Sequence, residues 1–77
     1  MLWARRSADQ GDAGGEYFLG VLYKNGWGVT SDLRAASSWF ERAAKQGDEY
    51  AVQALRELAA EGVPEVFAAL RRLRLAP

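Results

Sequence analysis

The chain has 77 residues, of which 49% are hydrophobic and 26% are charged, so it holds enough apolar material for one small folded domain and intrinsic disorder is excluded. Ten basic residues balance ten acidic ones, which excludes the broad positive field that binding to nucleic acid or to an anionic membrane requires. Cysteine and histidine are both absent; disulfides and the usual zinc ligands are therefore excluded, and we expect neither a metal nor a cofactor.

Residues 1–10 are polar and charged after Trp3, and so they lack the apolar run of a signal peptide. No segment of the chain approaches the roughly 20 apolar residues that span a bilayer. We therefore expect cytoplasmic residence without membrane contact. Leu2 and Trp3 begin a helical segment that is too short to be stable alone. We expect this open end to associate with a second chain through Leu2 and Trp3, or to be completed by upstream units of a longer protein.

Residues 13–25 predict the first complete helix. Apolar side chains cover more than one face of this segment, and Asp12 is placed to cap its first free amides. Gly26 and Gly28 then supply the permissive backbone that reverses the chain. Trp27 lies between these glycines, and two interpretations are open for it: packing back onto the next helix, or contact with a partner.

Residues 31–46 and 48–61 predict two further helices, because their apolar residues recur at helical spacing and Gly47 separates them. Gly62 ends the later one, and Pro64 suits the first turn of another helix. The apolar stripe predicted for this last helix consists of Val66, Phe67, Leu70 and Leu73. No run alternates apolar and polar residues as a strand does, so the predicted class is all-α.

The sequence repeats itself after 36 residues. This shift aligns nine identical pairs, from Trp3 with Trp39 to Gly26 with Gly62, and such a period is typical of stacked helix pairs. The predicted fold is therefore an αα-hairpin repeat solenoid, an α-α superhelix with about one full repeat and partial flanking units. In this division, residues 1–11 are the tail of a preceding repeat helix, residues 12–47 the full repeat, and residues 48–77 a degenerate repeat with a C-terminal cap.

Small residues, aromatic residues and glycine turns form one pattern within the full repeat: Ala13, Tyr17, Leu19-Gly20, Tyr23, Gly26-x-Gly28-Val29, Asp32, Ala36, Trp39-Phe40 and Ala43-Ala44-x-Gln46-Gly47-Asp48. This pattern resembles a Sel-one-like repeat, a relative of the tetratricopeptide repeats. The second copy departs from it, because Arg56 stands at the position of Gly20 and Gln53 at that of Tyr17. These departures indicate that the segment from Pro64 to Arg74 is a closing cap.

The resemblance implies that the first helix of each pair lines a concave face that binds a protein or peptide partner. If Leu19, Gly20 and Tyr23 face the paired helix, a neighbouring stripe is left for the partner, and it continues one period later. The predicted partner-binding residues are Tyr17, Val21, Lys24, Asn25, Tyr50, Gln53 and Glu57. Tyrosines beside charged residues suit peptide recognition. The open alternative is that Tyr17 and Tyr50 only pack between neighbouring repeats.

No catalytic constellation is predicted, and the chain is expected not to be an enzyme. No serine is followed three positions later by lysine, and the glycines at positions 11, 14 and 15 fit no nucleotide-binding fingerprint. Capping and solvation explain Asp9, Asp12 and Glu16 better than paired-carboxylate catalysis does. The predicted function is therefore a protein–protein interaction module or scaffold.

Two alternatives to this function remain. The repeats could be a non-catalytic appendage of a larger enzyme or envelope protein. Alternatively, Arg71, Arg72 and Arg74, which have no acid near them in the sequence, could contact nucleic acid or a membrane. We expect these arginines to be a solvated helix terminus, where cations complement the helix dipole.

Overall fold

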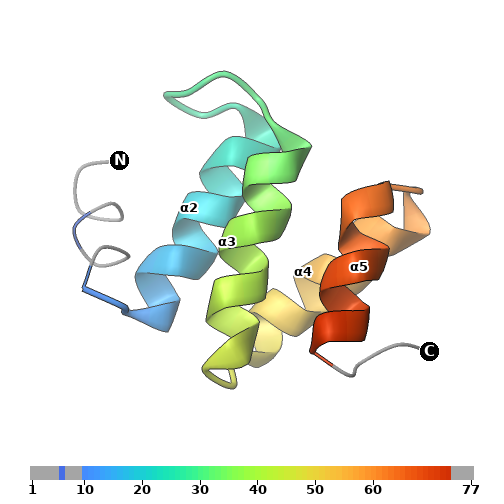
Figure 1. Ribbon diagram of the computed structural model, residues 1–77. Coiled ribbons are helices and arrows are strands. Elements are labelled where there is room, and N and C mark those ends of the chain that lie inside the picture. The colour runs from blue at the N-terminus through green and yellow to red at the C-terminus, as the bar shows by residue number, and fades with distance from the viewer. Residues whose placement is uncertain (1–5, 7–9, 74–77) are drawn as a thin grey trace.

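The computed structural model describes residue 6 and residues 10–73. Within these residues there are four α-helices and no strand: α2 (Ala13–Asn25), α3 (Leu33–Lys45), α4 (Glu49–Ala60) and α5 (Pro64–Arg72). Figure 1 shows the helices in this order. The predicted all-α class and helix-pair architecture are therefore confirmed.

The starts of α2, α3 and α4 are fixed by aspartate caps. Asp12, Asp32 and Asp48 each accept hydrogen bonds from the backbone N–H groups two and three residues later, at 2.8–3.4 Å. A cap of this kind stabilises a helix by about 1 kcal/mol. At the other end of α2, Gly26 adopts the left-handed conformation with φ of 72°, which a residue without a Cβ reaches most easily.

The crossing of α2 and α3 is close because Gly20 has no side chain. A Cβ added there would lie 2.4 Å from Cε1 of Phe40, whose side chain is fully buried. Gly20 thus faces the paired helix, as the sequence analysis supposed. Trp39 is half-buried and packs against the buried Leu19 and Leu22.

The larger core lies between α3, α4 and α5. Its fully buried members include Ala36, Phe40, Ala43, Ala51, Leu55, Leu58, Val66 and Ala69. The prediction for α5 is wrong in one respect, since Phe67 is 47% exposed while Ala69 is fully buried. Val66, Ala69 and Leu70 share the core face, and Phe67 is turned about 100° away from Val66 around the helix.

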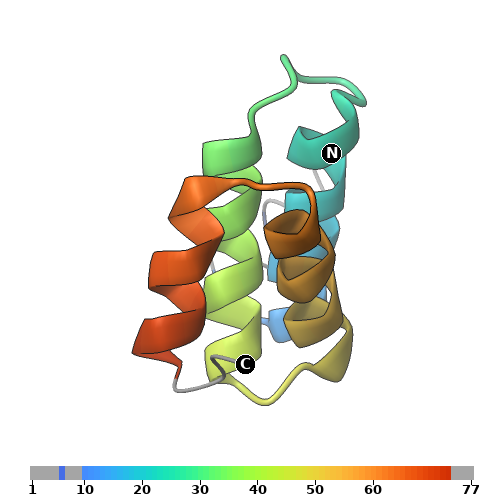
Figure 2. The ribbon, with the colours of Figure 1, turned by 90° about the vertical axis from the view of Figure 1, so that its right-hand side faces the viewer.

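The helices form two layers, with α2 and α4 on one side and α3 and α5 on the other (Figure 2). Within each layer the two helices run in the same direction (Figure 1). Loop length differs between the hairpins, since residues 26–32 connect α2 to α3 but only residues 61–63 connect α4 to α5. Because the second loop is shorter, α5 begins earlier in the sequence than the 36-residue period would place it.

Candidate protein-binding surface

The seam between α2 and α4 is built around two tyrosines. The Tyr17 ring lies 5.7 Å from the Phe40 ring and 6.1 Å from the Tyr50 ring, between centroids, tilted by 43° and 47°. Tyr17 is half-buried against the core, so it packs between helices as the structural alternative held. Tyr50 is 71% exposed. It presents most of its ring to solvent while one side touches Tyr17.

At the other end of the seam, an ion pair joins α2 to α4. Nζ of Lys24 lies 3.9 Å from Oε2 of Glu57, and the side chain of Glu57 remains 63% exposed. An exposed ion pair of this length contributes little stability, between about 0 and 1 kcal/mol. The ion pair therefore places the two side chains near each other, and both can still form hydrogen bonds to another molecule.

The seven residues predicted to bind a partner all lie on α2 and α4, and we call them the α2–α4 stripe. Contacts join Tyr17 to Tyr50 and Lys24 to Glu57. Val21 is half-buried, whereas Asn25 and Gln53 are exposed. The stripe is thus joined across the two helices at its tyrosine pair and at its charged pair. Leu2 and Trp3, predicted for self-association, lie outside the described residues.

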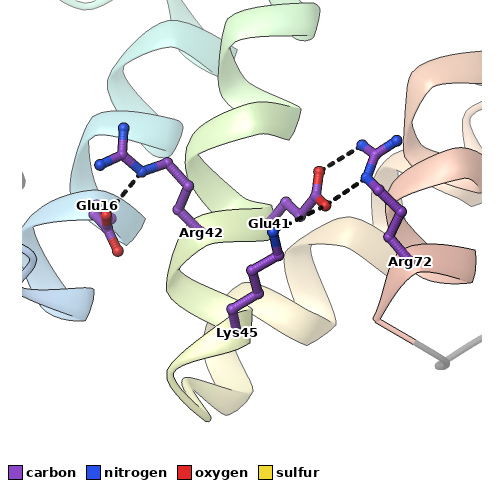
Figure 3. A network of polar contacts seen from close by, with 5 residues as sticks. All are labelled: Glu16, Glu41, Arg42, Lys45 and Arg72. Atoms are coloured by element: carbon purple, nitrogen blue, oxygen red, sulfur yellow. Dashed lines mark hydrogen bonds and ion pairs between the residues drawn. The ribbon is translucent and has the colours of Figure 1, made fainter.

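A buried carboxylate that the sequence did not reveal joins α2 to α3. Glu16 is only 2% exposed, so its predicted solvation is wrong. Its Oε2 lies 3.1 Å from Nε of Arg42 (Figure 3), and its Oε1 accepts a hydrogen bond of 2.6 Å from Nε2 of Gln46. The Arg42 guanidinium also stacks over the Trp39 ring at 4.7 Å. These contacts satisfy a charge that would otherwise be costly to bury.

A second carboxylate joins α3 to α5. Nε and Nη2 of Arg72 donate to the two oxygens of Glu41 at 2.7 and 2.6 Å, and Lys45 approaches Glu41 at 3.9 Å (Figure 3). The hydrogen bonds from Arg72 lower the pKa of Glu41 and, reciprocally, raise the pKa of Arg72. Arg72 lies in the last turn of α5 and its side chain is 58% exposed, as expected for a solvated arginine terminus, but it also pairs with Glu41, which was not predicted. Arg71 is exposed, and Arg74 lies outside the described residues.

A matching contact joins the first turns of these two helices. Nε of Arg34 donates to Oε1 of Glu65 at 2.8 Å. Arg34 and Glu65 are 31 residues apart, as are Glu41 and Arg72. The two contacts thus fix α5 in one register along α3, and they have opposite polarity.

Two further surfaces are present: one lies outside the stripe, and the other shares Gln53 with it. Trp27, in the turn after α2, is 59% exposed. The interpretation that its ring is packed back onto α3 is therefore not supported. On the outer face of α4, a shallow groove of about 350 Å³ is lined by Glu49, Val52, Gln53 and Arg56. These positions include the equivalents, one period later, of Ala13, Tyr17 and Gly20 in α2.

Among the described residues, no group of three or more acidic side chains gathers as a metal site would require. No helix in that part of the chain has the length and apolar character needed to cross a bilayer. The groups that the described surface presents to another molecule are an exposed aromatic ring, side-chain amides and charged groups that form only a long ion pair.

Comparison with known proteins gives two kinds of match. The family model described as the Sel1 repeat matches residues 1–12 and 13–48. A stretch of 57 residues is 44% identical to the chitin synthase regulator SKT5 of Malassezia restricta, covering 74% of this chain and 4% of that protein. Over 59 residues the chain is 41% identical to chitin synthase regulatory factor 3 of Schizosaccharomyces pombe, covering 77% of this chain and 6% of the relative.

A third relative is the activator of C kinase protein 1 of Saccharomyces cerevisiae, 41% identical over 59 residues, or 73% of this chain and 10% of that protein. The chain therefore spans only a small part of the length of these curated relatives. No solved structure matches it.

Proposed function

The chain belongs to the Sel1 repeat family, and from this we propose that it is a protein–protein interaction module that binds a segment of a partner protein on the α2–α4 stripe. One observation carries the proposal: Tyr17 meets Tyr50 and Lys24 meets Glu57 across the seam of two neighbouring repeats. Exposed tyrosine beside charged groups is a composition favoured at protein interfaces.

The names of the relatives support a regulatory role without catalysis. Two are described as regulators of chitin synthase and one as an activator of a kinase, and each acts on an enzyme according to its name. By analogy, this chain is proposed to hold a partner in place and to perform no reaction of its own. The alternative of an appendage to a larger enzyme differs only in whether that partner is covalently attached.

We also propose that residues 48–77 close the stack. A further first helix would pack on the outer face of α4, where Glu49, Gln53 and Arg56 are exposed. Of the equivalent residues in α2, Tyr17 contacts Tyr50 of the next repeat, whereas Gly20 meets Phe40 of its own helix pair. Charged and amide groups there would be desolvated by another helix without evident partners, which opposes further stacking.

The test of the main proposal uses a photoreactive amino acid in place of Tyr50, compared with the same amino acid at Ser38. Both positions are exposed, but Ser38 lies on α3 in the opposite layer. Cross-linking in source lysate should give a discrete product from position 50 that is absent from position 38. Unlabelled wild-type chain should compete for it, whereas Tyr50→Ala chain should compete less well. Equal products from both positions would contradict the proposed site.

A further inference from the structure

The neutral charge of the whole chain conceals a separation of charge between the two layers. Residues 12–25 and 48–61, which form α2, α4 and their caps, contain six acidic and two basic side chains. Residues 32–46 and 63–73, which form α3, α5 and their caps, contain three acidic and five basic ones. The layer with the stripe is therefore acidic, and the opposite layer is basic.

Only part of this negative charge is available to a partner. Asp12 and Asp48 are engaged in capping, and Glu16 is buried against Arg42. Glu57 and Glu61 remain exposed, four residues apart at the end of α4. Glu57 has the long contact with Lys24. Glu61 has no ion-pair partner within the described residues.

The basic side chains of the same layer offset this charge only in part. Lys24 makes the long contact with Glu57, and Arg56 is exposed on α4 one residue before Glu57. Successive residues of a helix are turned about 100° apart, so Arg56 lies on a neighbouring face of α4, whereas Glu57 and Glu61 share one face. The side-chain charge on that face is therefore negative.

We infer that the partner segment bound by the α2–α4 stripe is cationic, with an arginine or lysine against Glu57 and Glu61. This inference rests on the proposed function and specifies its ligand. An incoming guanidinium can replace the distant Lys24 contact with direct hydrogen bonds to Glu57. An apolar or aromatic side chain of the same segment covers the exposed ring of Tyr50.

The geometry also sets a spacing within the partner. Tyr50 and Glu57 lie seven residues apart on α4, which is about 10 Å along the helix axis. An extended peptide advances about 3.3 Å per residue. The apolar and the basic side chains of the partner therefore stand about two to four residues apart, and not next to each other.

The experiment is a selection from a phage-displayed library of random 12-residue peptides against the immobilised chain, followed by fluorescence anisotropy on labelled peptides. We expect enriched peptides to contain arginine or lysine two to four residues from an aromatic or aliphatic residue. Their affinity should fall as salt is raised, because exposed charges are screened. Glu57→Gln combined with Glu61→Gln should weaken binding at least five-fold.

Glu49→Gln is the matched control, since Glu49 is an exposed acid at the opposite end of the same helix. It should leave peptide affinity unchanged, and thermal melts should show all variants folded. Neutral or acidic peptides, or binding unaffected by the double variant, would overturn the inference and leave the proposed function standing. Failure to enrich any peptide would count against both. Self-association that Glu57→Gln abolishes would identify a second copy as the occupant and overturn the peptide inference.

Discussion

Replacing Gly20 by leucine tests the packing on which both helix pairs depend. The first added carbon would lie 2.4, 2.6 and 2.9 Å from three ring atoms of Phe40, well inside van der Waals contact. Phe40 cannot retreat easily, because it is fully buried and its ring packs on Tyr17. Overpacking of this kind costs about 1–3 kcal/mol, and leucine adds three further carbons beyond the clash. The gain in helix propensity over glycine, about 1 kcal/mol, offsets part of this.

The measurement is urea unfolding followed by circular dichroism, which yields the free energy of unfolding by linear extrapolation. We expect Gly20→Leu to lower it by up to about 2 kcal/mol, which is the overpacking cost of about 1–3 kcal/mol less the propensity gain of about 1 kcal/mol. Arg56→Leu, at the equivalent position of α4, should change it by less than about 0.5 kcal/mol because Arg56 is exposed. Adding Phe40→Leu to the Gly20 variant should recover stability by relieving the clash. Equal losses at both positions, or no recovery, would refute the reasoning.

Three further predictions concern charge and the chain start. The pKa of Glu41 is lowered by Arg72, so this contact stabilises the fold above the ordinary glutamate pKa of about 4.3 and is lost as pH falls through the lower folded-state pKa; Arg72→Leu should reduce stability at pH 7 and flatten the acid limb of the unfolding midpoint against pH. Arg42→Leu should cost about 1–3 kcal/mol in the same urea assay, because it leaves the buried Glu16 with a neutral partner alone. Sedimentation at rising concentration should show association that Trp3→Glu reduces; a chain that stays monomeric throughout would contradict the proposed self-contact.

Local signals in the sequence were sufficient for most of the fold. Aspartate caps and glycine ends depend on residues within one turn of the helix terminus, so Asp12 and Gly26 could be assigned from neighbours alone. The tight crossing at Gly20 followed from residue size within the repeat pattern. The stripe residues were likewise placed on the correct helices, although whether they bind a partner stays a prediction.

Long-range pairing could not be predicted from the same signals. Glu16 and Arg42 are distant in the sequence, as are Glu41 and Arg72, and nothing in either local segment distinguishes a partner from a solvated charge. The exposure of Phe67 depends on how α5 is rotated. That rotation follows from the short loop at residues 61–63 and from the register set against α3, and neither is visible in hydrophobic periodicity.

The two contacts between α3 and α5 together favour one register of α5 along α3. Arg34 faces Glu65 and Glu41 faces Arg72, and the two positions on each helix are seven residues apart. Sliding α5 by two turns in one direction would set Arg72 beside Arg34, and in the other direction Glu65 beside Glu41, so either misalignment is repelled. A hairpin with both of its charges reversed should likewise be rejected by this α3 and accepted only by an α3 reversed to match. Because α3 and α5 belong to one chain, exchanging all four residues in concert should keep α5 in its register, whereas exchanging only the two residues of α5 should not.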